Sequence, residues 1–86
     1  MSYLSENVIP GSHGKTFGTN AKTGKELEKI LHALINIGGI KDIIIKTDTY
    51  PREFTIHSST VIAVREIQNK IRSAGFHAIP KRMLLL

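Results

Sequence analysis

The hydrophobic residues between positions 27 and 37 recur at steps of three and four, which places them on one face of an α-helix. These residues are Leu27, Ile30, Leu31, Leu34 and Ile37. Thr23 stands where this helix would begin, and Glu26 follows three residues later, which is the spacing of a capping box. Gly38 and Gly39 mark its end, because glycine adopts the left-handed C-cap conformation without steric cost.

Four short segments have the composition or the alternation of β-strands. They are residues 15–21 with Phe17 as the core residue, the Ile-Ile-Ile run at 43–45, residues 52–57 with Phe54 and Ile56 on the core face, and residues 77–79, which Pro80 ends. Residues 48–51 read as a hairpin connection between the second and third strands, and residues 58–60 as a loop. Because proline cannot donate to a ladder, the last strand is expected at an edge of the sheet.

A second helix is predicted over residues 64–74, with Val64, Ile67, Ile71 and Ala74 on one stripe and Gly75 at its end. The order is then strand, helix, strand, strand, helix, strand. The sequence therefore predicts an α+β protein, a ferredoxin-like βαββαβ sandwich with a four-stranded antiparallel sheet in the order 4-1-3-2 and two helices on one face.

The chain divides into three parts around this domain. Residues 1–14 show neither the period of a helix nor that of a strand, and they contain Pro10, Gly11 and Gly14. They are therefore predicted to form an irregular N-terminal arm, in which Val8 and Ile9 favour some local order. Residues 15–80 make up the domain, and residues 81–86 form a basic and then apolar C-terminal tail. A chain of 86 residues accommodates one hydrophobic core and hence one domain.

The composition excludes several classes of function. The chain has no cysteine, so disulfides, thiolate nucleophiles and cysteine metal sites are absent. Its serines lie outside any nucleophile-elbow pattern and its acidic residues are not visibly paired, so we do not expect an enzyme. The N-terminus lacks a signal-peptide pattern, and no apolar run approaches the roughly 20 residues of a membrane span. We therefore expect a cytoplasmic protein without membrane contact.

The formal charge of +5, from 12 Lys and Arg against 7 Asp and Glu, permits binding to nucleic acid or another polyanion. The basic residues are scattered, however, and the residues expected on the open face of the sheet include no aromatic ring to stack on bases. Those residues include Ile44, Lys46, Glu53, Thr55 and His57. A basic binding module that uses this face is the alternative hypothesis. Ile44 and the C-terminal leucines 84–86 could also support self-association, which leaves monomer and weak dimer both open.

Three parts of the sequence together resemble the heavy-metal-associated domain, the family of copper chaperones and of the small N-terminal domains of copper-transporting ATPases. They are Leu-x-x-Ile-Leu-x-x-Leu-x-x-Ile-x-Gly-Ile at 27–40, Ile-x-Ile at 43–45, and Val-x-x-Ile-x-x-x-Ile-x-x-x-Gly-Phe at 64–76. The resemblance covers roughly residues 15–80 and rests mainly on core and turn positions.

The family carries G-M-x-C-x-x-C between its first strand and first helix, where two thiolates bind soft cations such as Cu(I). Counting back from Gly39 and Ile40, Thr23 and Glu26 occupy the two cysteine positions in this chain. The resemblance thus implies a small non-enzymatic domain with a degenerate metal loop. Such a domain would be related to metal binding and transport, or would serve as a docking module for a protein partner.

Histidine is the remaining candidate for metal binding. The resemblance places His77 close to the same loop, where with Glu26 or Asn20 it would make a weak site for Zn(II), Ni(II) or Cu(II). His13 and His57 are expected at the opposite end on neighbouring strands, as a second weak pair. Neither set has a local metal-binding spacing, so surface or hydrogen-bonded histidines are the competing interpretation. A weakly bound divalent transition metal is the only cofactor that the sequence suggests.

Overall fold

The computed structural model describes residues 7–11, 14–48 and 52–81. Within them the chain is a small mixed α+β domain with two helices and antiparallel sheets. In chain order the elements are β1 (Asn7–Val8), β2 (Lys15–Thr19), α2 (Gly24–Ile35), β3 (Ile40–Lys46), β4 (Arg52–Ser58), β5 (Ile62–Ala63), α3 (Val64–Ser73) and β6 (Ala78–Pro80). Most of the predicted hairpin connection (residues 49–51) and most of the tail (residues 82–86) lie outside this part.

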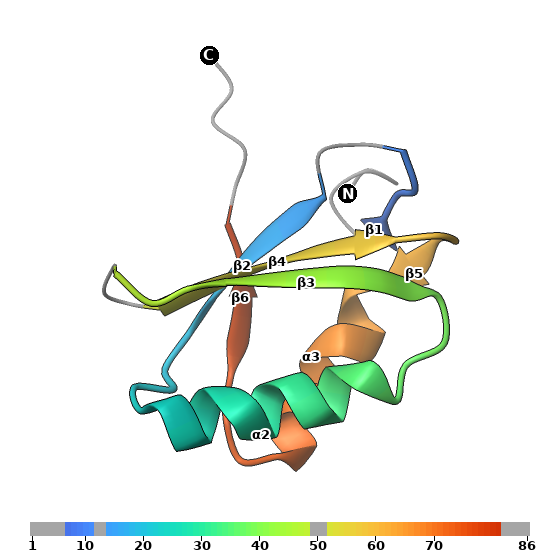
Figure 1. The fold of residues 1–86 in the computed structure, drawn as a ribbon. Helices are drawn as coiled ribbons and strands as arrows, with labels where there is room; N and C mark the ends of the chain where they lie inside the picture. The colour runs from blue at the N-terminus through green and yellow to red at the C-terminus, as the bar shows by residue number, and fades with distance from the viewer. Residues whose placement is uncertain (1–6, 12–13, 49–51, 82–86) are drawn as a thin grey trace.

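Four strands form one antiparallel sheet in the order β3-β4-β2-β6. Phe17 of β2 lies opposite Phe54 of β4, and Ile44 of β3 lies opposite Thr55 of β4. Numbered along the chain among themselves, these strands lie in the order 2-3-1-4, which reads 4-1-3-2 from the other edge. Figure 1 shows both helices on the same side of this sheet.

A second, two-stranded sheet makes the observed order of elements differ from the predicted one. β1 pairs antiparallel with β5, with Asn7 opposite Ala63 and Val8 opposite Ile62. Val8 is 1% exposed and belongs to the core. The stretch 1–14, predicted to be irregular, therefore contains a strand. Two residues are too few to show an alternation, so the pattern could not reveal it.

The core lies between the helices and the sheet. The rings of Phe17 and Phe54 stack at a centroid distance of 5.3 Å and an interplanar angle of 11°. The helices contribute most of the stripes that their periodicity predicts, namely Leu27, Ile30 and Leu34 from α2 and Val64, Ile67 and Ile71 from α3. Leu31 and Ala74, predicted on the same stripes, are only half-buried. Burying each of the larger apolar side chains stabilises the fold by about 1.5–3 kcal/mol, so the core holds both helices on one face of the sheet.

Helix α2 ends at Ile35, earlier than the double glycine predicts. The N–H of Ile37 still donates to the carbonyl oxygen of Leu34 at 2.9 Å, and Ile37 is buried. Gly39 has φ +96° and enters β3, where a Cβ atom would lie 2.9 Å from Cγ2 of Thr60. The left-handed glycine is therefore needed for the turn into the strand and not for the end of the helix.

Helix α3 has an uncapped start and a closed end. Its N-cap residue is Ala63, which offers no side-chain acceptor. At the other end the N–H of Gly75 donates to the carbonyl oxygen of Arg72 at 2.9 Å and that of Phe76 to Ile71 at 3.1 Å. With φ +96° at Gly75, this is a Schellman motif, as the glycine at that position predicts. Neither described helix is long and apolar enough to cross a membrane.

The last strand is shifted by one residue from the predicted segment 77–79. Pro80 belongs to β6 and lies opposite Phe17. β6 is an edge strand of the four-stranded sheet, and the predicted edge position is confirmed. The chain continues the ladder at Lys81, whose N–H donates to the carbonyl oxygen of Thr16 at 2.8 Å.

Candidate functional site

The loop that joins β2 to α2 is held by helix capping. Thr23 has an extended backbone, and its Oγ1 accepts a hydrogen bond from the N–H of Glu26 at 3.1 Å. In return Oε1 of Glu26 accepts from the N–H of Thr23 at 3.1 Å and from that of Lys22 at 2.7 Å. The capping box predicted from the sequence is confirmed, and both side chains serve backbone donors at the start of the helix.

These bonds stabilise the charged form of Glu26. The N–H of Lys22 and then that of Thr23 lower the pKa of this carboxyl below its ordinary value. Desolvation acts in the opposite direction and raises the pKa, and the charges of Lys29 and Lys22 lower it further. A metal ion that bound through Oε1 would have to displace two backbone donors, which makes this oxygen a poor ligand.

Asn20 and His77 meet beside this loop although 57 positions separate them. Oδ1 of Asn20 accepts a hydrogen bond from the backbone N–H of His77 at 2.9 Å. The bond ties the start of the loop to the segment after α3, and it occupies the oxygen through which Asn20 would bind a metal. Throughout residues 7–11, 14–48 and 52–81, no three or more His, Asp or Glu side chains are grouped to hold a metal ion.

His57 lies at the other end of the sheet, beside Asp42. The β3–β4 register places the two residues opposite each other, with Nδ1 of His57 at 4.0 Å from Oδ2 of Asp42. This Nδ1 atom is buried and has no hydrogen-bond partner among the described residues. His13, its expected companion, lies outside those residues, so the structure does not test the second pair.

The ring of His57 packs against the backbone of Gly14. A Cβ atom at position 14 would lie 2.9 Å from both Cδ2 and Nε2 of the ring, and Gly14 has φ +86°. The ring also borders a hollow of about 280 Å³ lined by Ile9, Gly11, Lys41, Asp42, His57 and Ser58. Lys41 and Asp42 carry opposite charges, so the hollow favours neither an anion nor a cation.

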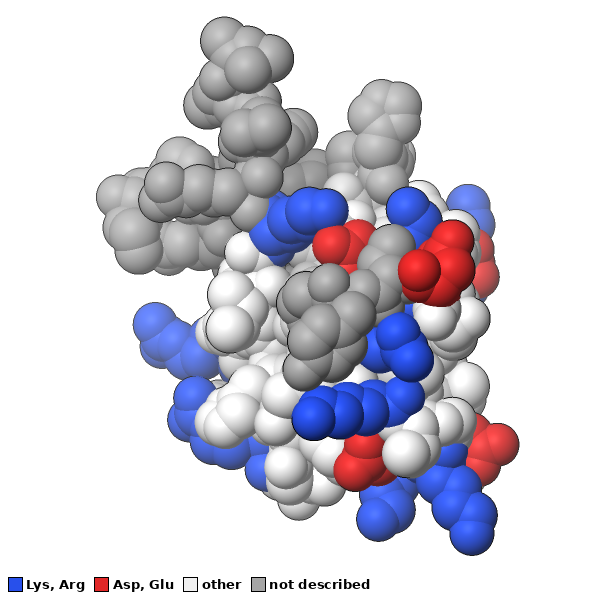
Figure 2. Space-filling model, turned by 90° about the vertical axis from the view of Figure 1, so that its left-hand side faces the viewer, with Lys and Arg blue, Asp and Glu red and all other residues white. Residues whose placement is uncertain are grey.

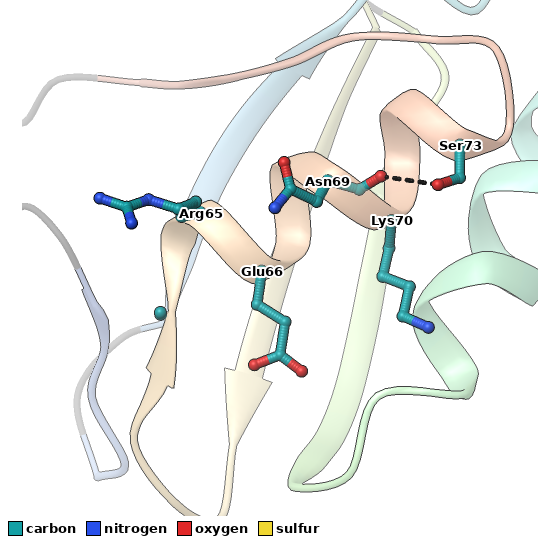
Figure 3. A pocket seen from close by; sticks show the side chains of 6 residues that line it. Arg65, Glu66, Asn69, Lys70 and Ser73 are labelled. Atoms are coloured by element: carbon teal, nitrogen blue, oxygen red, sulfur yellow. Dashed lines mark hydrogen bonds between the residues drawn. The ribbon is translucent and has the colours of Figure 1, made fainter.

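A shallow depression on the outward face of α3 is lined by Ala63, Arg65, Glu66, Asn69, Lys70 and Ser73. Figure 3 shows Arg65 extending away from Glu66 and Lys70, whose charged ends extend to the same side of the helix without meeting. The Oγ of Ser73 donates to the backbone oxygen of Asn69 at 3.0 Å, a contact within the helix. These side chains do not converge on one point, as expected of a solvated helix face.

The face of the four-stranded sheet opposite the helices is polar and crossed by side-chain contacts. The hydroxyl oxygens of Thr16 and Thr55 lie 2.8 Å apart, and Nζ of Lys81 lies 2.8 Å from Oε2 of Glu53. Ile44 is 50% exposed on the outer strand. We call this surface the open face.

The basic residues form no continuous patch in the view that Figure 2 gives. Lys and Arg are interspersed there with Asp, Glu and neutral residues. Such mixing weakens the local field that a polyanion would meet, even though the formal charge of the chain is +5.

No protein-family model, no curated protein and no solved structure matches the chain.

Asp42 was missed in the sequence, although a signal for it was present. The hairpin connection predicted at 48–51 pairs Lys46 with Glu53, and counting outward from that pair brings position 42 opposite position 57. The register of a hairpin follows from its loop, so a firm assignment of the turn would have identified the His57–Asp42 neighbours. The resemblance had placed His77 near Asn20, and the structure brings the two residues together. The hydrogen bond from the backbone of His77 to Asn20 had no local signal of its own, because it joins two separate loops.

Proposed function

We propose that this chain is a non-enzymatic binding module of ferredoxin-like architecture, related to the heavy-metal-associated domain, whose metal loop serves as a helix cap. The single observation that carries the proposal is the reciprocal bonding of Thr23 and Glu26. These two residues stand at the positions where the family keeps its cysteines. Oγ1 of Thr23 and Oε1 of Glu26 are engaged by backbone N–H groups of the same loop.

Two further observations support this proposal. The carbonyl oxygen of Asn20 accepts a hydrogen bond from the backbone N–H of His77. Asn20, another residue of the suggested metal site, therefore also has a structural role. The core stripes of both helices are those on which the resemblance rests. The loop keeps its structural role without thiolates, and binding falls to another surface.

The open face is the surface that we propose for a protein partner. It lies on the side of the sheet away from both helices, and it combines threonines, an ion pair and the partly exposed Ile44. Protein interfaces commonly mix apolar and polar groups in this way. A partner with hydrogen-bonding and charged side chains fits this face better than nucleic acid, because the described residues place no Phe, Tyr or Trp ring on it.

The metal part of the proposal is tested by titrating Zn(II), Ni(II) and Cu(II) into 15N-labelled protein. Because the capping bonds occupy the loop, the amides of residues 20–26 and of His77 should keep their chemical shifts up to millimolar metal. Saturable shifts of these amides at micromolar metal would contradict the proposal. Shifts confined to the surroundings of His57 would place metal binding elsewhere and leave the loop as proposed.

The relation to the family is tested by returning the thiolates. The T23C/E26C variant should bind Cu(I) with a 1:1 stoichiometry that the wild-type chain lacks, measured by competition with a chromogenic Cu(I) chelator. T23C alone is the matched control and should compete far less, because one thiolate cannot replace two. Equal competition by the double and single variants would show that this loop does not have the geometry of the family's metal loop.

The partner surface is tested with a photo-reactive amino acid in place of Thr55 on the open face. In cells that naturally make the protein, it should give a discrete product larger than the chain. The same probe at Glu28, exposed on α2, is the control and should give none. A product from Glu28 and none from Thr55 would move the partner to the helical side.

A polyanion is the second candidate, favoured by the formal charge of +5. Binding of this kind falls steeply as salt rises. A mobility shift of single-stranded RNA at low salt that is lost at about 0.15 M salt would indicate non-specific attraction only. A shift that persists at that salt would favour this candidate over a protein partner.

A further inference from the structure

The four-stranded sheet has two unlike edges. At one edge, β6 is three residues long and contains Pro80, which has no N–H to donate. At the other edge, β3 is seven residues long and pairs only with β4 among the described strands. A long edge strand presents a row of backbone donors and acceptors that another strand can join. The β3 edge is therefore the one suited to accept a strand.

The outer strand alternates in exposure along its length. Ile43 and Ile45 are half-buried and pack against the core, whereas Asp42, Ile44 and Lys46 are exposed on the open face. The exposed positions thus carry an acid, an isoleucine and a base, evenly spaced along the strand. In an antiparallel copy of the strand the same three residues run in the opposite order, so the acid of each copy can face the base of the other.

We propose that two copies of this chain associate by antiparallel pairing of their β3 strands about a two-fold axis at Ile44. Ile44 then faces Ile44 of the second copy, Asp42 faces Lys46 of the second copy, and Lys46 faces its Asp42. The result is one continuous eight-stranded sheet with the four helices on a single side. This inference goes beyond the proposed function, since it names a second copy of the chain as a partner.

The register is restricted if the helices of both copies are to lie on the same side of the joined sheet. Residues directly opposite each other in an antiparallel pair point to the same face. Both copies keep their helices on one side only if an exposed position lies opposite an exposed position. The axis must therefore pass through a residue of β3 and not between two residues.

Charge then selects among the remaining registers. An axis at Ile43 sets Asp42 against Ile44, and an axis at Ile45 sets Asp42 against Asp48. An axis at Asp42 or at Lys46 sets like charges directly against each other, which is destabilising. Among these registers only the axis at Ile44 pairs opposite charges twice and buries an apolar side chain between them.

The association is expected to be weak, because the interface is small and because both copies carry a net positive charge. Pairing along one short strand buries less than the roughly 1,200 Å² of a standard stable interface. Two copies that each carry a formal +5 also repel one another at low salt. Tests therefore need physiological salt, high concentration and a method that traps a minor dimer.

The absence of cysteine from the chain allows a single thiol to be introduced for trapping. Directly opposed residues in an antiparallel pair have Cα atoms about 4.5–5.5 Å apart, within the range that a disulfide requires. Under mild oxidant at about 0.15 M salt, I44C should form a disulfide dimer at least tenfold faster than I79C. Ile79 lies on the opposite edge strand and is 68% exposed against 50% for Ile44, so random collision would favour I79C. Equal rates, or a faster I79C, would overturn the proposal.

Charge reversal in the I44C background tests the register. D42K and K46D should each slow disulfide formation at least fivefold, because like charges then face each other twice. The combined D42K/K46D exchange should restore the rate, and an equimolar mixture of the two single-reversal chains should give mainly the mixed dimer. Asp42 also lies near His57, so K46D serves as the variant without that contact. Single reversals that leave the rate unchanged, or an exchange that fails to restore it, would refute this register.

Discussion

Replacing Thr23 with alanine is the most direct measure of what the β2–α2 loop does. The change removes one acceptor, the Oγ1 that receives the N–H of Glu26 at 3.1 Å. The backbone N–H groups of Lys22 and Thr23 remain and still donate to Glu26. The variant therefore isolates the forward half of the capping box.

The expected magnitude follows from the N-cap position. Substituting an N-cap threonine with alanine costs about 1 kcal/mol of stability, within a range of roughly 0.5–2 kcal/mol. A domain of this length has an unfolding free energy of roughly 4–13 kcal/mol, so the loss is measurable and leaves the chain folded. An unfolding entropy of about 0.18 kcal/mol/K converts it into a fall in Tm of about 5–6 °C.

The assay is urea and thermal unfolding followed by far-ultraviolet circular dichroism. T23S is the matched control, because serine keeps the hydroxyl and should lie within about 0.3 kcal/mol of the wild type. A loss below about 0.3 kcal/mol for T23A would refute the capping role and reopen the loop as a binding site. So would an equal loss for T23S, since the hydroxyl would then not be the cause.

Three further predictions test the pH dependence, the turn and the N-terminal strand. Because its folded-state pKa is lowered, Glu26 contributes stability that is present above its unfolded pKa and lost as pH falls through the folded pKa. The difference in unfolding free energy between wild type and E26Q, measured in urea titrations, should therefore narrow as the pH is lowered below the ordinary carboxyl value of 4.5, and a constant difference would contradict this. G39A should lower the free energy of unfolding by about 1–2 kcal/mol in the same assay, because alanine is strained at φ +96°. G38A should not, because a Cβ atom there meets nothing within 4 Å, and equal losses for the two variants would refute the strain argument. V8A should lower the free energy of unfolding by about 2 kcal/mol, because Val8 is 1% exposed, whereas V61A at 45% exposure should be nearly neutral. A neutral V8A would show that β1 does not pack against the core.

Local signals predicted the helices and their ends to within a few residues. The stripe from Leu27 to Leu34 and the pair Thr23 and Glu26 are short-range patterns, and the helix that they predict is present with its cap. Gly75 likewise ends α3 where it was expected to. The end of α2 was placed too late, because the glycine at position 39 serves the entry into β3 and not the helix.

Contacts between distant segments were beyond these signals. β1 exists because Asn7–Val8 finds Ile62–Ala63, and neither pair of residues carries a strand pattern of its own. The bond from His77 to Asn20 and the approach of Gly14 to the His57 ring also join segments that are far apart in the sequence. Loop closure of this kind depends on how the packed core positions the ends, which no local period records.

By itself the sequence determined most of the residues that face the core, where the main helices begin, and that the chain carries no thiolate. These features follow from periodicity, capping chemistry and composition, which act over a few residues. Only the tertiary structure decided that Oδ1 of Asn20 and Oε1 of Glu26 accept hydrogen bonds from backbone N–H groups, and that Asp42 lies beside His57. It also decided that β3, seven residues long, lies at an edge of the sheet formed by the described strands. The physical reason is that packing between segments distant in sequence decides which hydrogen-bond partner a polar side chain meets and which strand lies at an edge. The energetic contribution of a polar side chain depends on that partner.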